Sequence, residues 1–447
     1  MEVVVASSSV ESDIACWDFN TGSELLRYKS CASPNHGLVS VGDRFLASSQ
    51  LLHTNDGGSV KYWAWSKPQP DAKSSQEEPI KPLAANREGT YVVGGGVSGT
   101  IYLWEVTSGR MLRKWDAHYR AVSCLRFSDD STILFSGSED GEIRAWNLVT
   151  IFDDHQSQHE KYGHLLSFTE HSLSVTDMVL GFGYDPVIVS ASEDRTCKIW
   201  SFSRGALLRN IVFPTIIDAI AMDPGENLLF AGGRDGNIYV AALNTAKTAS
   251  SKYGLHIINC FSNHSKAVTC LAWGLSGNYL ISGSEDGMVR VWDAKTANII
   301  RVLKHSKGPV NNILIIRQQV SHMIPNSQAS SRRHGSSLPP PLEKRAYEAD
   351  KDAGFKAVIG LQDTCNKSTD AVYITSDVME RQIRELQQQG SASAEMEIER
   401  LKHENKRCIQ MVQQWKKMYD NLHQFCVNEL VDGDKGGAPN GNAPYCC

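Results

Sequence analysis

The 447-residue sequence has no long apolar run, no excess of basic residues and no ordered cysteine pattern. No stretch reaches the roughly 18 apolar residues of a membrane-spanning helix, so no such helix is expected. Lys and Arg total 45 against 50 Asp and Glu, a net charge of −5, which argues against nucleic-acid binding through bulk positive charge. The 11 cysteines are an odd number without metal-ligand spacing, which favours free thiols in a reducing compartment.

A repeated segment dominates the first 300 residues. Three copies, at residues 136–146, 190–200 and 282–292, read SGSEDGEIRAW, SASEDRTCKIW and SGSEDGMVRVW. In each copy an Asp precedes a Trp by six residues, and apolar residues alternate between them as in a strand with one buried face. Weaker copies place the equivalent position at residues 17, 63, 104 and 241, with intervals of 41 to 54 residues. This period is typical of four-stranded propeller blades and predicts seven of them.

These units resemble WD40 repeats, and the resemblance implies an all-β, seven-bladed β-propeller held by hydrogen-bonded His, Ser, Asp and Trp residues. Three blades carry complete tetrads: His118, Ser136, Asp140 and Trp146; His171, Ser190, Asp194 and Trp200; and His264, Ser282, Asp286 and Trp292. A buried indole N–H needs an acceptor and a buried Asp needs donors, so the tetrads are expected to be structural.

The tetrads argue against catalysis. A hydrolase triad of these residue types would occur once, rather than three times at matching offsets. We therefore predict that the protein is not an enzyme and has no catalytic, cofactor-binding or metal site. Loss of Asp140 is expected to strand the His118 and Trp146 donors.

Ring closure is also readable from the sequence. The first unit begins at Glu2 and has room for only three strands, so residues 310–316 are expected to supply the fourth and leave no open edge. The propeller is thus predicted over residues 1–317. Residues 318–345, rich in Ser and Pro, predict a flexible linker, whose basic pairs 332–333 and 344–345 suit either nuclear import or a solvated linker.

A helix with heptad spacing is predicted near the C-terminus. We expect a helical tail over residues 346–430, with a coiled coil at about 394–430, and a disordered end at 431–447. The seam alternates in threes and fours: Ile398, Leu401, Asn405, Cys408, Val412, Trp415, Tyr419 and Leu422. A buried Asn at an a position commonly fixes the register of a two-stranded coil. The seam therefore predicts either self-association or docking of an amphipathic helix on the propeller or on another protein.

Three stretches resemble one WD-repeat family in particular: residues 99–125, residues 171–183 and the Trp-less sixth blade at 230–238. With the start on a blade strand and the helical tail, they are similar to the WD-repeat subunit of the Rix1 complex, whose plant members include the root-initiation-defective type. The resemblance implies a scaffold in rRNA spacer processing and in late maturation and export of the large ribosomal subunit. An effect on meristem and root development would follow, because new organs need ribosomes.

The resemblance also implies a location and partners. The partners would be a Rix1-type helical-repeat subunit, a smaller third subunit, and the pre-60S particle with its AAA-type remodelling ATPase. Relatives dimerise through the C-terminal helix, which agrees with the seam. The expected location is the nucleus, in the nucleolus or nucleoplasm.

A propeller of this kind could also serve as a ubiquitin-ligase receptor or as a histone-binding protein. A ubiquitin-ligase receptor usually carries an Arg two residues after Trp-Asp, whereas Trp17-Asp18 is followed by Phe19-Asn20. A histone-binding propeller would use acidic turns such as Glu139-Asp140 to hold basic tails, although these turns also belong to the tetrads.

Overall fold

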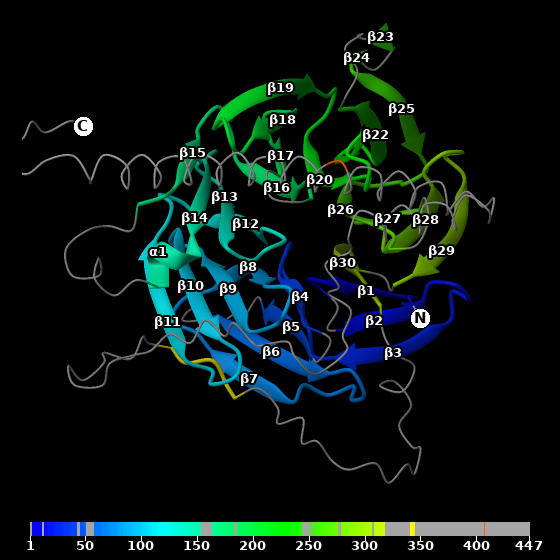
Figure 1. Cartoon of the computed structure of the whole chain (residues 1–447). Helices are drawn as coiled ribbons and strands as arrows, with labels where there is room; N and C mark the ends of the chain where they lie inside the picture. Colours follow the sequence, from blue (N-terminus) through cyan, green and yellow to red (C-terminus); the bar gives the residue numbers. More distant parts are fainter. Residues whose placement is uncertain are drawn as a thin grey trace, which may run out of the picture. The chain divides into compact units, whose positions relative to one another are not determined.

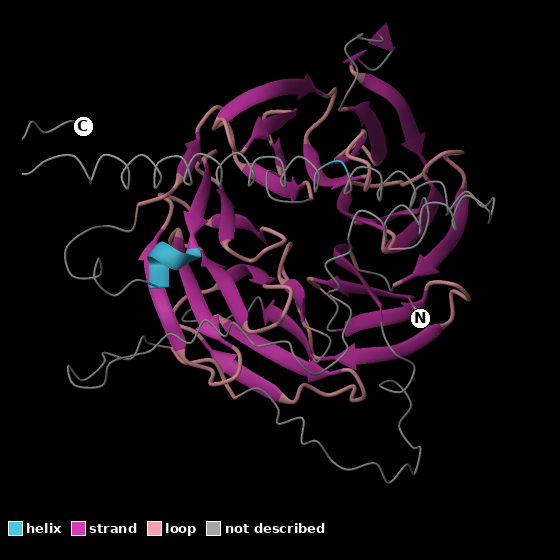
Figure 2. Cartoon of the chain, in the orientation of Figure 1, coloured by secondary structure: helices cyan, strands magenta, loops and turns pink. Residues whose placement is uncertain are grey.

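The computed structural model describes most of the first 317 residues and two short pieces beyond them. The described residues are 2–10, 13–42, 45–50, 58–152, 163–182, 186–243, 250–251, 254–275, 279–305, 308–317, 340–344 and 406. Within them, the strands form seven four-stranded sheets arranged in a ring (Figure 1). Strand dominates the described secondary structure, and helix α1 (Leu148–Phe152) is short (Figure 2). The expected all-β, seven-bladed propeller is therefore confirmed.

Each blade is an antiparallel sheet whose first strand faces the centre of the ring and contacts the first strands of its neighbours. From the inside outward the blades are β30 (Val310–Arg317), β1 (Glu2–Ser8), β2 (Asp13–Asp18) and β3 (Glu24–Lys29); β4 (Leu38–Val41), β5 (Phe45–Gln50), β6 (Ser59–Ala64) and β7 (Ala72–Ser75); β8 (Ile80–Ala85), β9 (Tyr91–Gly96), β10 (Thr100–Glu105) and β11 (Met111–Asp116); β12 (Val122–Phe127), β13 (Ile133–Ser138), β14 (Ile143–Asn147) and β15 (Leu166–Phe168); β16 (Val175–Leu180), β17 (Val187–Ser192), β18 (Thr196–Ser201) and β19 (Ala206–Val212); β20 (Ile217–Met222), β21 (Leu228–Gly233), β22 (Asn237–Ala242) and β25 (Ile257–Ser262); and β26 (Val268–Trp273), β27 (Tyr279–Ser284), β28 (Met288–Asp293) and β29 (Ile299–Lys304). The small hairpin of β23 (Ser250–Ser251) and β24 (Gly254–Leu255) lies between β22 and β25.

The repeat position aligned from the sequence falls on the third strand of every blade. These residues are Trp17, Trp63, Trp104, Trp146, Trp200, Ala241 and Trp292, and all are buried. Around them, the apolar side chains form seven clusters, each of which joins two neighbouring blades. A single blade cannot bury its own apolar faces, so stability depends on the closed ring.

Blade one combines strands from both ends of the propeller. Strand β30 pairs with β1, with Val3 opposite Ile316. Asn312 strengthens the junction between β30 and the rest of the ring, because its side-chain amide donates to the Pro34 carbonyl at 2.7 Å. The closing strand predicted at residues 310–316 is therefore confirmed.

A loop of blade two reaches across the ring. His36, just before β4, places Nε2 3.1 Å from the Thr176 carbonyl on β16 of blade five. The His36 carbonyl accepts a hydrogen bond from the Leu83 N–H of blade three at 2.9 Å. The loop therefore links three blades at the end of the ring where the first strands begin.

The predicted linker, helical tail and disordered end fall largely outside the described residues. All eight seam residues from Ile398 to Leu422 lie there, so their association stays a prediction. Six cysteines in the described chain are free thiols. No helix within the described ranges has the length and apolar character needed to cross a bilayer.

Candidate functional site

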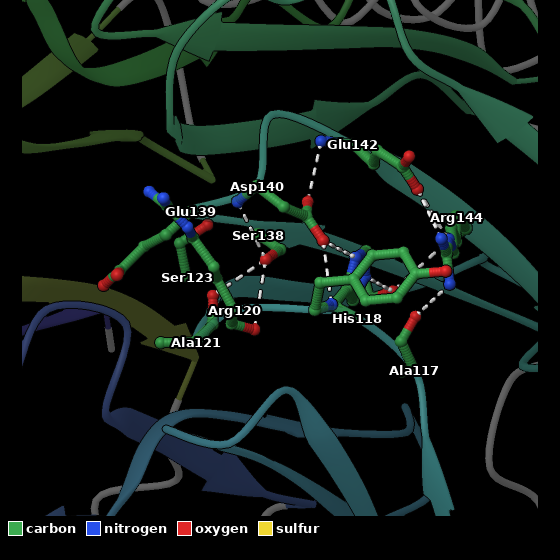
Figure 3. A network of polar contacts seen from close by, with 12 residues as sticks. Ala117, His118, Arg120, Ala121, Ser123, Ser138, Glu139, Asp140, Glu142 and Arg144 are labelled. Carbon is green, nitrogen blue, oxygen red and sulfur yellow. Dashed lines mark hydrogen bonds and ion pairs between the residues drawn. The ribbon is translucent and has the colours of Figure 1, made fainter.

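The structure brings the four residues of each complete tetrad together. In blade four, His118 Nε2 lies 2.7 Å from Ser136 Oγ. His118 Nδ1 lies 3.2 Å from Asp140 Oδ2 (Figure 3). Trp146 Nε1 donates to the same Ser136 Oγ at 2.9 Å. The tetrad therefore links the segment before β12 to β13, to the β13–β14 turn and to β14.

The direction of each hydrogen bond follows from the chemistry of the partners. The Asp140 carboxylate only accepts, so His118 Nδ1 carries the proton and Nε2 accepts from the Ser136 hydroxyl. The hydroxyl oxygen in turn accepts from the Trp146 indole. The expectation that Asp140 also holds the Trp146 donor is wrong, because Ser136 stands between them.

Blades five and seven repeat this geometry. His171 lies 2.9 Å from Asp194 and 2.8 Å from Ser190, which accepts from Trp200 at 2.9 Å. In blade seven, the corresponding distances are 3.0, 2.7 and 2.7 Å. The same four-residue arrangement at three blade positions is typical of a structural role.

The carboxylates of the tetrads are held in the charged form. Burial raises the pKa of Asp140, but hydrogen bonds from His118 and the Glu142 backbone outweigh it and lower the pKa to about 2. The pKa of Asp286 is also about 2, because bonds from Arg290 and His264 outweigh burial. The pKa of Asp194 is lowered in the same way. A general acid or base works best with a pKa near the operating pH, so these groups are poorly suited to proton transfer at neutrality.

Blade three has lost its tetrad. At the positions of the His, Ser and Asp stand Gln76, Gly94 and Ser98, while Trp104 is retained. The Glu78 carboxylate accepts from the Ser98 backbone and hydroxyl at 2.9 and 2.8 Å, and from the Tyr102 hydroxyl at 2.6 Å. The repeat pattern does not predict this replacement, although the acidic Glu78, two positions after the missing histidine, was a usable signal.

The acidic turns are engaged within the propeller. Glu139 pairs with Lys81 at 2.7 Å, and Glu193 pairs with Arg234 at 2.7 Å. A cluster of His118, Asp140 and Glu142 has the residue types of a metal site. However, the Glu142 carboxylate accepts from Arg144 at 2.5 and 2.9 Å, and Asp140 holds His118 (Figure 3). These groups are therefore occupied by protein donors.

A second polar network lies near the centre of the ring. Asp177 on β16 is buried and accepts from the backbone of Met178 at 2.7 Å and of Ile220 at 2.9 Å. Arg126 of blade four reaches it at 3.3 Å, and His36 lies 3.6 Å away. Burial lowers the pKa of His36 despite the nearby carboxylate. No periodic pattern in the sequence marks this network, because its members come from four blades.

Two exposed apolar side chains stand beside two of the tetrads. Tyr119 follows His118 and is 86% exposed, with the Arg144 guanidinium 5.8 Å from its ring. Leu173, two residues after His171, is 52% exposed. Exposed aromatic and aliphatic residues beside charged groups are a composition that protein-binding surfaces use.

The repeats and their hydrogen bonds define a WD-repeat propeller. The family model for the WD domain, G-beta repeat, matches residues 109–147, 163–201 and 255–293. A solved structure of the computationally designed Ika8 protein is 27% identical with a TM-score of 0.50, over 68% of this chain and 85% of that one.

Similarity to natural proteins extends further along the chain. Protein ROOT INITIATION DEFECTIVE 3 of Arabidopsis thaliana is 50% identical over 96% of this chain and 98% of its own length. WD repeat-containing protein 18 of Bos taurus is 34% identical over 76% of this chain and 77% of its own. Pre-rRNA-processing protein IPI3 of Yarrowia lipolytica is 27% identical over 77% and 82%. The chain belongs to the family of these WD-repeat proteins, and its resemblance to the plant root-initiation-defective type is confirmed.

Proposed function

We propose that the protein is a non-enzymatic scaffold subunit of a Rix1-type complex that acts in rRNA spacer processing and in late maturation and export of the large ribosomal subunit. The observation that carries this proposal is the 50% identity over 96% of the chain, which extends beyond the propeller into the tail. Relatives named for pre-rRNA processing support the same role. They do not favour a ubiquitin-ligase receptor or a histone-binding propeller.

The geometry of the tetrads supports a scaffold. Their polar atoms bond to one another, and the carboxylates have low pKa values, so the residue types of a hydrolase serve the fold. The exposed side chains of Tyr119 and Leu173 remain available to a protein partner. The expected partners are a Rix1-type helical-repeat subunit, a smaller third subunit, and the pre-60S particle with its AAA-type ATPase. The expected location is the nucleus, and reduced ribosome supply would affect meristems and roots.

Affinity purification of the tagged full-length protein, followed by mass spectrometry, tests this proposal. We expect the two partner subunits and large-subunit assembly factors, and depletion of the protein should raise the rRNA precursor that retains the internal spacer. Recovery of a cullin adaptor or histones without assembly factors, together with normal spacer removal, would overturn it.

A surface variant sharpens the test. Combined replacement of Tyr119→Ala and Leu173→Ser should reduce capture of the partner subunits without lowering the melting temperature. Val302→Ser is the matched control, because Val302 is 53% exposed but lies on the outer strand β29. Equal effects of the two changes would show that the tetrad side of the propeller is not the binding surface.

A further inference from the structure

Residues 340–344, Pro-Pro-Leu-Glu-Lys, contact the side of blades two and three, although the sequence pattern predicted a flexible linker there. Leu342 is only 4% exposed and packs in an apolar cluster with Tyr62 of blade two and Trp104 of blade three. Figure 1 shows this segment in yellow, close to β7 and β11. A leucine buried to this extent is part of the core.

Three hydrogen bonds hold the segment from both blades. The Leu342 N–H donates to Ser74 Oγ on β7 at 2.7 Å. The Glu343 N–H donates to the Gly109 carbonyl in the β10–β11 turn at 2.8 Å. The Glu343 carbonyl accepts from Trp104 Nε1 at 3.0 Å. Backbone hydrogen bonds combined with one buried side chain are a common way in which grooves recognise peptides.

Because blade three lacks the serine of a complete tetrad, its Trp104 indole N–H requires an acceptor from elsewhere in the chain. In complete blades, the indole N–H donates to a serine, but residue 94 of blade three is glycine. A Cβ at Gly94 would lie 2.8 Å from Ile80 Cγ2 and 3.0 Å from the Trp104 ring, so these two side chains fill the space that a serine would use. The N–H of this buried tryptophan therefore needs another acceptor, and the Glu343 carbonyl provides it.

We propose that the groove formed by β7, Trp104 and the β10–β11 turn is a peptide-binding site for a Pro-Pro-Leu-Glu sequence. Its resident ligand is this chain's own segment 340–344. The two prolines lack N–H donors and restrict the backbone, so little entropy is lost on binding. A connection of roughly 20 residues to β30 gives the segment a local concentration near the millimolar range. The proposal is independent of the role in ribosome assembly.

Hydrogen exchange of the full-length protein tests occupancy of the groove. The Leu342 and Glu343 amides should exchange at least tenfold more slowly than in an unstructured peptide, because both are hydrogen-bonded. Gly109→Ala should remove this protection, since its Cβ would lie 2.5 Å from the Pro341 carbonyl. Unprotected exchange in the wild-type protein would overturn the proposal.

Gly22→Ala is the matched control for Gly109→Ala. Gly22 occupies the corresponding turn of blade one with φ +73°, against +71° for Gly109, so the backbone strain is nearly the same. The nearest atom to its Cβ is the flexible end of Arg301 at 3.1 Å. Protection of the 340–344 amides should survive in this variant. Equal loss in both variants would mean that general destabilisation, rather than displacement of the segment, is responsible.

Binding of the peptide in trans tests recognition. A fluorescent peptide of residues 337–346 should bind the full-length Leu342→Asp variant at least tenfold more tightly than the wild type, whose groove is occupied. The milder Leu342→Ala variant serves if the first does not fold. A peptide with Asp in place of its leucine should not bind. Equal binding to wild type and variant, or no binding to either, would contradict a transferable peptide site.

Discussion

Replacement of Ser136 by alanine should destabilise the propeller through two stranded polar groups. Ser136 is fully buried and stands between His118 Nε2 at 2.7 Å and Trp146 Nε1 at 2.9 Å. Without the hydroxyl, the indole N–H has lost its acceptor and the imidazole nitrogen has lost its donor. Each stranded group costs about 1–3 kcal/mol, so the free energy of unfolding should fall by about 2–6 kcal/mol.

Thermal unfolding followed by circular dichroism measures this loss. For a domain of this size, 1 kcal/mol corresponds to roughly 2 °C, so the melting temperature should fall by about 4–12 °C. Capture of partner proteins well below that temperature should be unchanged. Lost capture with an unchanged melting temperature would instead assign Ser136 to recognition.

A double-mutant cycle isolates the hydrogen bond itself. Trp146→Phe removes the indole N–H, so Ser136→Ala should cost about 1–3 kcal/mol less in that background than in the wild type. The control pairs Ser136→Ala with Trp292→Phe of blade seven, and these distant changes should be additive. Additivity of the matched pair, or equal coupling of the control pair, would refute the tetrad geometry.

Three further results are expected. A fragment that ends at Lys307 lacks β30 and exposes the edge of β1, so it should aggregate or melt well below a fragment that ends just after Arg317, and equal melting would contradict ring closure by this strand. The low folded-state pKa values of the tetrad carboxylates stabilise the protein above about pH 4, and this stabilisation should be lost as the pH falls towards 2. The Asp140→Asn variant, which lacks one of these carboxylates, should lose less stability over the same range. If the melting temperatures of the two proteins change equally between about pH 2 and 5, the carboxylates do not stabilise the fold in this way. Replacement of Leu401 and Leu422 by Asp should abolish self-association in light scattering and leave the propeller's melting unchanged, whereas a monomeric wild type, alone and with its partner subunit, would exclude the dimer.

The blade count and the tetrads could be predicted because their signals recur. Each blade repeats the same strand, turn and strand at a regular interval, so the Trp146 and Trp292 positions identify one another in the sequence. The closing strand was predictable for a related reason, since blade one lacked a fourth strand and residues 310–316 were an unassigned, largely apolar stretch. The order of hydrogen bonds within a tetrad could not be predicted from the sequence, because it depends on which side chains meet in three dimensions.

The remaining features depend on contacts between distant segments without any periodic pattern. The sequence alone determined the all-β class, the ring of blades and the family, because repetition encodes them locally. Only the tertiary structure revealed that His36 meets Thr176 across the ring and that Glu343 meets Trp104. A composition rich in Ser and Pro predicts a linker, since it lacks an apolar face, yet a single leucine can bury itself where two blades leave a groove. At this groove, blade three has glycine where the complete blades have serine, and only the structure shows that the Trp104 indole N–H takes the Glu343 carbonyl as its acceptor instead.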